Sequence, residues 1–290
     1  MDMKKIHSIL IAELNEFIKN KPDTLIDIAI IGSTSGHYGW DEKMMGDTDL
    51  LFMCTHFQSS DFFEWLNMLL SNIKKIICEY YNYNIDISYR AIDGPYKLPI
   101  YKVERPALFL HILLNTPENY LLNRGALITY TWSKYDTLLN SGVLKKFEKM
   151  KPTKENLLFD DRGINKALSI LENDNSILKF IEYNLDNGEK FTIEFDENTL
   201  IFSEYLMHMV VTIARHIARS DQYIEADTLS NQDYALWYAS KYDDYFVTFI
   251  YNLKYKVSVF GYLEALKWPL KMMVKAWLKE TRDKILYEIS

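Results

Sequence analysis

The stretch between residues 25 and 53 constrains the fold of this chain more than any other. It begins with the apolar run LIDIAII, which is typical of a buried strand, and Gly32 and Ser33 follow as a pair that favours a turn. After a loop come Asp47 and Asp49, which lead into a second apolar run. Side chains two residues apart on a strand share one face of the sheet. The sequence therefore predicts two strands, with both carboxylates projecting together from one strand end.

Two carboxylates held this close repel each other unless a cation lies between them. Hard oxygen ligands favour Mg²⁺, which commonly binds through one or two carboxylates together with substrate phosphates. Gly32 permits close approach of the backbone, and Ser33 offers a hydroxyl and an N–H to a phosphate oxygen. We expect a nucleotide–metal site here, although the same residues are also ordinary turn chemistry between strands.

A third acid favours the metal site over a simple turn. A helix-like segment at 61–78 is followed by YNYNIDISYRAI, whose alternation predicts a strand. Asp86 stands in the middle of this segment, where a carboxylate is unfavourable unless it faces a cation. A metal shared with Asp47 and Asp49 would account for it.

Together, Gly32-Ser33, Asp47-x-Asp49 and Asp86 resemble the polymerase-β-like nucleotidyltransferase superfamily. Its pattern is an apolar strand, a Gly-Ser, an Asp-x-Asp or Asp-x-Glu, and a third acid on a later strand. The resemblance covers roughly the first 90 to 130 residues. It implies that Asp47 and Asp49 hold two Mg²⁺ ions on ATP or another nucleoside triphosphate, whose phosphates Gly32 and Ser33 grip. It also implies that Asp86 completes the second metal site or acts as general base.

The loop between Ser33 and Asp47 is longer than this family pattern and carries His37, Tyr38 and Trp40. It either covers the nucleotide or is a plain insertion.

The C-terminal half carries a narrower resemblance. The segment VVTIARHIARSDQYIEAD is similar to one in the streptomycin/spectinomycin adenylyltransferases, whose helical domain has a Thr-aliphatic-Ala-Arg run. This resemblance implies that Arg215 reaches the ATP phosphates across a domain cleft, and a guanidinium suits phosphate oxygens. Thr228 stands where that family has a lysine, and an interhelical salt bridge is the alternative role for Arg215. His208 and His216 are expected to be packing or surface residues.

After Arg215 the chain becomes acidic and aromatic. An acidic pocket with aromatic walls suits a polyamine-like sugar, through charge pairing and cation–π contact. The alternative is helix caps and solvated faces, with the aromatic rings in the core. The residues concerned are Asp221, Glu225, Asp227, Asp233, Trp237, Tyr238, Tyr242, Asp243, Asp244 and Tyr245.

Lysines recur every four residues on the last predicted helix, at Lys267, Lys271, Lys275 and Lys279. They could attract phosphate or RNA, or simply form a solvated face. The net charge of −7 and the isoelectric point near 5.5 argue against a long nucleic-acid footprint. RNA is therefore a possible but not a favoured partner.

The composition indicates a globular protein without a membrane partner. Hydrophobic residues make up 48% of the chain, which supports a core, and no run reaches the ~18 apolar residues of a membrane span. The N-terminus reads as an amphipathic helix and not as a signal peptide. Cys54 and Cys78 are expected to be buried thiols in a reducing compartment, so we expect a cytoplasmic location.

We expect an α+β protein with two domains. Residues 1–140 would form a nucleotidyltransferase domain, a small mixed sheet with helices, and residues 141–290 a helical bundle that closes the active cleft. From about Pro99 the pattern becomes helical, including ERPALFLHILLN, and the polar residues 140–163 predict a linker. A hairpin with Asn187-Gly188 at its turn is expected within the helical half, and the last helix is predicted at about 264–289.

The function that these features predict is Mg²⁺-dependent transfer of a nucleoside monophosphate, with AMP first, to a hydroxyl of a small acceptor. An aminoglycoside-type antibiotic is the leading acceptor, which would make the protein an antibiotic-resistance enzyme. One alternative is a toxin-type or defence-type nucleotidyltransferase acting on tRNA, protein or nucleotides. The other is an inactive nucleotidyltransferase-fold binding module.

Overall fold

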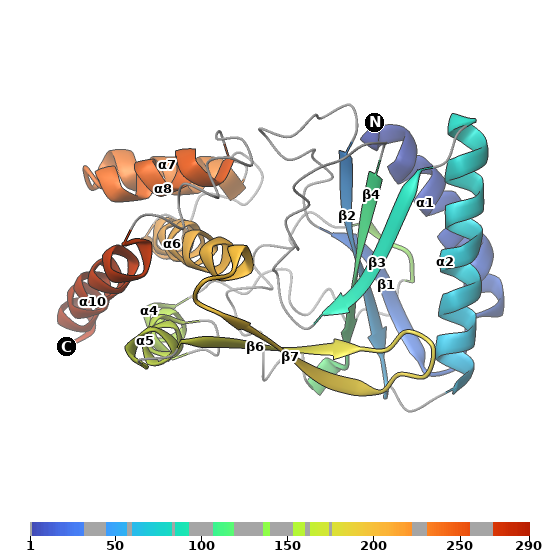
Figure 1. Cartoon of the computed structure of the whole chain (residues 1–290), viewed down its shortest axis with the longest axis horizontal. Helices are drawn as coiled ribbons and strands as arrows, with labels where there is room; N and C mark the ends of the chain where they lie inside the picture. Colours follow the sequence, from blue (N-terminus) through green and yellow to red (C-terminus); the bar gives the residue numbers. More distant parts are fainter. Residues whose placement is uncertain are drawn as a thin grey trace.

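The chain folds as an α+β protein in which a mixed sheet carries helices on one face and a further group of helices lies to its side (Figure 1). The structure is a computed structural model. It describes residues 2–31, 45–56, 60–82, 85–92, 107–118, 136–139, 153–159, 163–173, 176–221, 231–255 and 269–290.

In the described part of the chain, seven strands form one sheet in the order β5-β1-β2-β4-β3-β6-β7. The three central strands, β2, β4 and β3, run parallel, and β1 pairs antiparallel with β2. The short β5 pairs with the outer side of β1, and the antiparallel hairpin β6–β7 pairs with β3. The bounds are β1 Leu25–Ile31, β2 Met45–Cys54, β3 Asp86–Ile92, β4 Ala107–Asn115, β5 Asp136–Thr137, β6 Ile177–Tyr183 and β7 Lys190–Asp196.

Helices α1 (Met3–Phe17) and α2 (Ser60–Tyr81) cover one face of the sheet (Figure 1). The predicted N-terminal helix is confirmed, and the Asp2 side chain caps it by accepting a hydrogen bond from the Lys5 N–H at 3.2 Å. A short 3₁₀ turn, η1 (Ile18–Asn20), follows it. Alternate residues of β1, β2 and β4 form the hydrophobic core beneath these helices: Ile28, Ile30, Leu50, Phe52, Cys54, Leu108, Leu110, Ile112 and Leu114.

The segment that reads as the start of a helix, ALFLHILLN, is the strand β4, so the helical prediction for it was wrong. All nine of its residues are buried, because the strand lies between two parallel neighbours and is covered on both faces. Such strands are continuous apolar runs without alternation, and their sequence does not distinguish them from buried helices.

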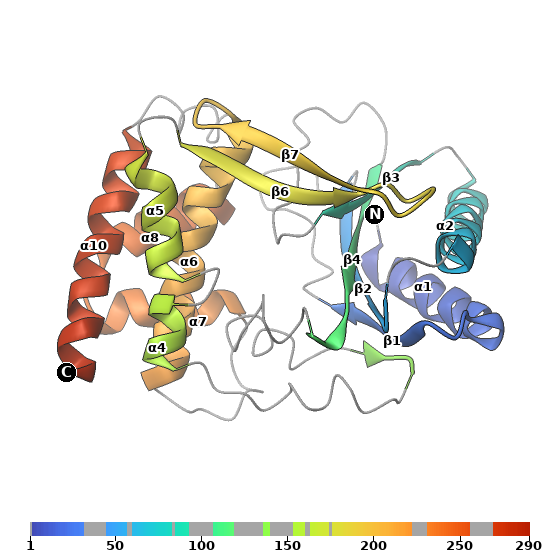
Figure 2. The same ribbon diagram turned by 90° about the horizontal axis from the view of Figure 1, so that it is seen from below.

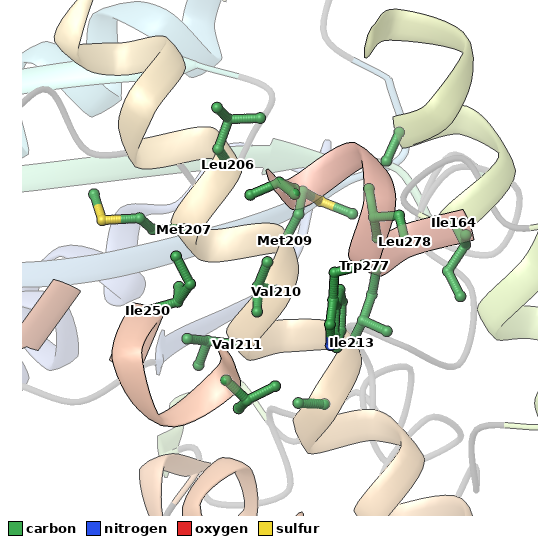
Figure 3. Close-up of a cluster of buried hydrophobic side chains, with 14 of the residues drawn as sticks. Ile164, Leu206, Met207, Met209, Val210, Val211, Ile213, Ile250, Trp277 and Leu278 are labelled. Carbon is green, nitrogen blue, oxygen red and sulfur yellow. The ribbon is translucent and has the colours of Figure 1, made fainter. Parts of the chain in front are cut away.

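The second group of helices packs around α6 (Leu200–Asp221), which contacts α4, α7, α8 and α10. The apolar positions predicted for this helix, such as Leu206 and Met209, are buried as expected. Figure 3 shows Val210 and Ile213 of α6 beside Trp277 of α10 in the resulting core. The other helices are α4 Lys154–Phe159, α5 Ile164–Glu172, α7 Asn231–Lys241, α8 Tyr245–Tyr255 and α10 Leu270–Ile289.

The predicted hairpin is present, with its turn at residues 184–189. It extends from the helical group to the edge of the sheet (Figure 2), so residues beyond position 140 contribute strands to that sheet. Arg90 of β3 holds it there by donating to both carboxylate oxygens of Glu182, at 2.8 and 2.5 Å. Asn67 of α2 donates to the Leu185 carbonyl at 2.8 Å, which secures the turn.

The predicted linker and domain boundary fall mostly outside the described residues. Within the linker, α4 forms a short helix, and the last helix begins at Leu270, after a segment that is not described. Cys54 and Cys78 are both free thiols, and burial raises the pKa of Cys54 to about 12. In the part of the chain that the structure describes, no helix has the length and apolar character needed to cross a membrane.

We predict that Gly188→Ala destabilises the hairpin. Gly188 has a φ of +74°, and a Cβ there would lie 2.2 Å from Cε2 of Phe63, so both the backbone and the packing would be strained. The free energy of unfolding, measured by urea denaturation, should fall by about 2 kcal/mol or more. Asp186→Ala, at an exposed position of the same turn, should change it by less than about 0.5 kcal/mol. Equal effects of the two changes would contradict this account.

Candidate functional site

The acids of the Asp-x-Asp motif lie within β2 and not before it, which corrects the predicted start of this strand. Parallel pairing with β4 begins at Met45 opposite Ala107 and extends the strand backward through both acids. Leu50 and Phe52 face the helices, so Asp47 and Asp49, at positions of the opposite parity, belong to the other face. The shared face that the sequence predicts for the two acids therefore agrees with the strand's register. Of Asp47 the structure describes only the backbone.

His111 is the side chain that the structure brings to Asp49. The two residues are paired across β2 and β4, and His111 Nδ1 lies 3.1 Å from Asp49 Oδ1. The His111 side chain is 2% exposed and that of Asp49 is 15% exposed, so this contact is largely shielded from water. The ring of Phe109, two residues earlier on the same face of β4, lies beside the imidazole with its centroid 6.3 Å away. Sequence reasoning missed His111 because it placed this segment in a helix.

Asp86 lies on the same face of the sheet but two strands away from Asp49. It is the first residue of β3 and its side chain is exposed, so solvation accounts for a carboxylate that was expected to lie in the strand interior. From the strand pairing, its Cα is about 16 Å from that of Asp49 and about 12 Å from that of Asp47. Carboxylates bind Mg²⁺ at about 2.1 Å, so the register does not bring Asp86 into a site shared with Asp49.

The remaining phosphate-binding candidates, Gly32 and Ser33, lie outside the described residues, as does the loop before Asp47. Among the side chains that the structure does describe, which exclude that of Asp47, no three His, Cys, Asp or Glu residues gather as a metal group. The chemistry of Asp49 nevertheless suits a Mg²⁺ site. Asp49 offers a carboxylate on the same face as Asp47, and the hydrogen bond with His111 orients that carboxylate.

Arg215 lies on α6, within the helical group. The main contacts of α6 among the described residues are with helices and with β7, and Figures 1 and 2 show it apart from strands β1 to β4. The next residue, His216, is completely buried and does not belong to a metal group in the described part of the chain. Burial, and then the positive charges of Arg215 and Arg219, hold the pKa of His216 well below its ordinary value. Nε2 of His208 lies 3.1 Å from Thr212 Oγ1, one turn along the helix.

The acidic and aromatic residues after Arg215 gather around a pocket of about 420 Å³ between α6, α7, α8 and α10. Of the predicted set, six residues line it: Asp221, Tyr238, Tyr242, Asp243, Asp244 and Tyr245. Phe246 and Trp277 add aromatic walls, and Glu280 and Glu288 add carboxylates. No residue of the sheet is among the described residues that line the pocket.

Much of the pocket's negative charge already has partners. Lys154 and Lys241 lie 3.6 and 3.7 Å from the Asp221 carboxylate, and Asp244 accepts a hydrogen bond from Trp277 Nε1 at 2.8 Å. Burial raises the pKa of Tyr238, so its phenol stays neutral at physiological pH. The pocket thus combines neutral aromatic rings with carboxylates whose charge is partly compensated, and both kinds of group attract cations in general.

The lysine stripe on the last helix is largely occupied by ion pairs. Lys271 pairs with Glu197, and Lys279 lies 3.1 Å from Glu172. Lys267 lies outside the described residues. These pairs favour a solvated structural face over an RNA-binding one, because acids at the same surface repel phosphate.

Comparison of the chain with known protein families, with curated proteins and with solved structures gave no match.

We predict that His216 makes the protein acid-sensitive. An unfolded histidine takes up a proton near pH 6.5, whereas His216 cannot do so in the fold, so the unfolded state binds more protons below that pH. Stability should therefore fall as the pH falls below about 6.5, by up to about 1.4 kcal/mol per pH unit from this residue.

The measurement is urea denaturation between pH 5 and 8. The variant His216→Leu should flatten the pH dependence, and His56→Gln, at an exposed histidine, should retain it. An unchanged slope in His216→Leu would refute the assignment.

Proposed function

We propose that the protein is a Mg²⁺-dependent nucleotidyltransferase that moves a nucleoside monophosphate from ATP, or another nucleoside triphosphate, to a hydroxyl of a small acceptor. The observation that carries this proposal is the position of the Asp-x-Asp motif. Asp47 and Asp49 lie on the face of β2 that α1 and α2 leave uncovered, and Asp49 is held there by His111. Two carboxylates on one face of a strand suit a metal-bound triphosphate.

In this proposal, the nucleotide-binding residues bind or orient, Asp86 accepts a proton, and no residue forms a covalent intermediate. Asp47 and Asp49 hold Mg²⁺, which when bound neutralises charge on the attacking and leaving oxygens during in-line displacement. Gly32 and Ser33 offer backbone and hydroxyl donors to the phosphates. Arg215 offers a guanidinium fork to the triphosphate once the helical group approaches the sheet. Asp86 is exposed on the same face of the sheet. It acts as a base toward the acceptor hydroxyl and does not bind the same metal ion as Asp49.

We propose a two-domain arrangement to go with this division of roles. One hydrophobic cluster lies between the sheet and helices α1 and α2, and a second lies among the helices around α6. We propose that the first belongs to a nucleotidyltransferase domain and the second to a helical domain that closes over the nucleotide. The two free cysteines agree with the reducing, cytoplasmic setting in which ATP is available.

The favoured acceptor class is a hydroxylated organic cation of the aminoglycoside type. The acidic and aromatic pocket supports this choice, since cations are attracted both by carboxylates and by the faces of aromatic rings. The pocket reaches Asp221, which is about 9 Å along α6 from Arg215. The ion pairs of the lysine stripe disfavour tRNA as the alternative acceptor.

We predict that the double variant Asp47→Ala, Asp49→Ala loses Mg²⁺-dependent ATP binding, because the metal loses both carboxylates. Isothermal titration with ATP in the presence of Mg²⁺ or of EDTA measures this. The wild type should bind more tightly with Mg²⁺ by at least tenfold, and the double variant should show no difference between the two conditions. Glu64→Ala, at an exposed acid on α2, is the matched control and should behave as the wild type. Retained Mg²⁺ dependence in the double variant would overturn the proposed site.

We further predict pyrophosphate release when ATP and an aminoglycoside are supplied together. The assay compares ATP, GTP, CTP and UTP, each with aminoglycosides, with bulk tRNA or with no acceptor. Pyrophosphate release with tRNA but not with aminoglycosides would show that RNA, and not an aminoglycoside, is the acceptor. No release under any condition, together with intact nucleotide binding, would indicate a binding module.

A further inference from the structure

Of the described residues, His111 is the one whose contact bears most directly on the Asp-x-Asp motif. Its partner, Asp49, is the second acid of that motif, and the two residues lie opposite each other in the parallel pairing of β2 with β4. Because both strands are central and pair on both sides, this register is anchored by the sheet and not by the side chains themselves.

The hydrogen bond has a defined direction. A carboxylate that binds a metal must be deprotonated, and an ionised carboxylate only accepts hydrogen bonds. Nδ1 of His111 must therefore be the donor to Asp49 Oδ1, over the observed 3.1 Å. A bond to one carboxylate oxygen orients the other, and its burial strengthens the effect because little water competes with it.

We propose that His111 is a positioning residue, which fixes the Asp49 carboxylate in the orientation that binds the metal of the nucleotide. This inference rests on the proposed function. It assigns to β4 a part that sequence reasoning had placed on β3: the neighbouring strand supplies an imidazole donor to Asp49, whereas the register keeps Asp86 from sharing a metal site with Asp49. Hydrogen-bond partners of metal-binding carboxylates typically affect metal affinity about 10- to 100-fold.

The imidazole allows a matched pair of variants. In His111→Asn, an amide nitrogen takes the place of Nδ1 and can still donate to Asp49. In His111→Gln, the longer side chain places its amide at the position of Nε2, and the donor to Asp49 is lost. If His111 served only packing, His111→Gln would be the milder change, because glutamine matches the length of histidine better than asparagine does. The hydrogen-bonding role predicts the opposite order, with His111→Asn the milder change.

The experiment uses Mn²⁺ as a spectroscopic substitute for Mg²⁺ and measures binding of the Mn²⁺–ATP complex to the protein, by the enhancement of the water proton relaxation rate relative to a protein-free Mn²⁺–ATP sample. We expect His111→Gln to weaken Mn²⁺ binding about 10- to 100-fold and His111→Asn to stay within about threefold of the wild type. Circular dichroism and urea denaturation establish that each variant is folded before it is titrated. Asn115→Ala, a truncation at a buried position on the same face of β4, should bind as the wild type.

The outcomes separate this inference from the function on which it rests. If the wild type binds no Mn²⁺, or if Asp49→Asn binds as tightly as the wild type, the metal site itself fails. If Asp49→Asn loses binding while His111→Gln retains it, the metal site stands and the role of His111 is refuted. If His111→Asn and His111→Gln weaken Mn²⁺ binding equally, His111 serves only packing, and the inference is also refuted.

Discussion

The candidate site depends on the parallel pairing of β2 with β4. In this register Asp49 lies opposite His111, and both side chains emerge on the face that α1 and α2 do not cover. Leu50 and Phe52 emerge on the other face and pack beneath those helices. A slip of one residue would exchange the two sets and bury the carboxylates beneath the helices. The hydrophobic burial on one face of the sheet therefore positions the polar groups on the other.

The hairpin β6–β7 connects the sheet to the helical group. Leu178 and Phe180, near the start of β6, belong to the core around α6, whereas Tyr183, at its end, belongs to the core beneath α1 and α2. The Arg90–Glu182 ion pair, only partly exposed, fastens the strand to the edge of the sheet. A single strand thus takes part in both cores. This connection holds one side of the helical group to the sheet, and closure over a nucleotide would have to pivot about it.

Sequence patterns predicted the elements whose signals are local. Strand β1 has the predicted bounds, the periodicity of α6 identified its buried positions, and Asn187-Gly188 marked the turn of a hairpin. The prediction failed for β4, where nine consecutive buried residues contain no alternation to separate a strand from a helix. The same error concealed His111. The sequence also does not reveal that Asp86 lies at the exposed first position of β3, two strands from Asp49.

By itself, the sequence determined that Asp47 and Asp49 share a face, because the two-residue period of a strand is a property of the backbone. It also determined the left-handed turn position at Gly188, which disfavours a side chain. Only the tertiary structure decided which strand lies beside β2. Asp49 and His111 are 62 residues apart, and neither segment specifies its partner. Burial of β4 between β2 and β3 makes that choice, and it brings an imidazole to Asp49 while keeping Asp86 two strands away.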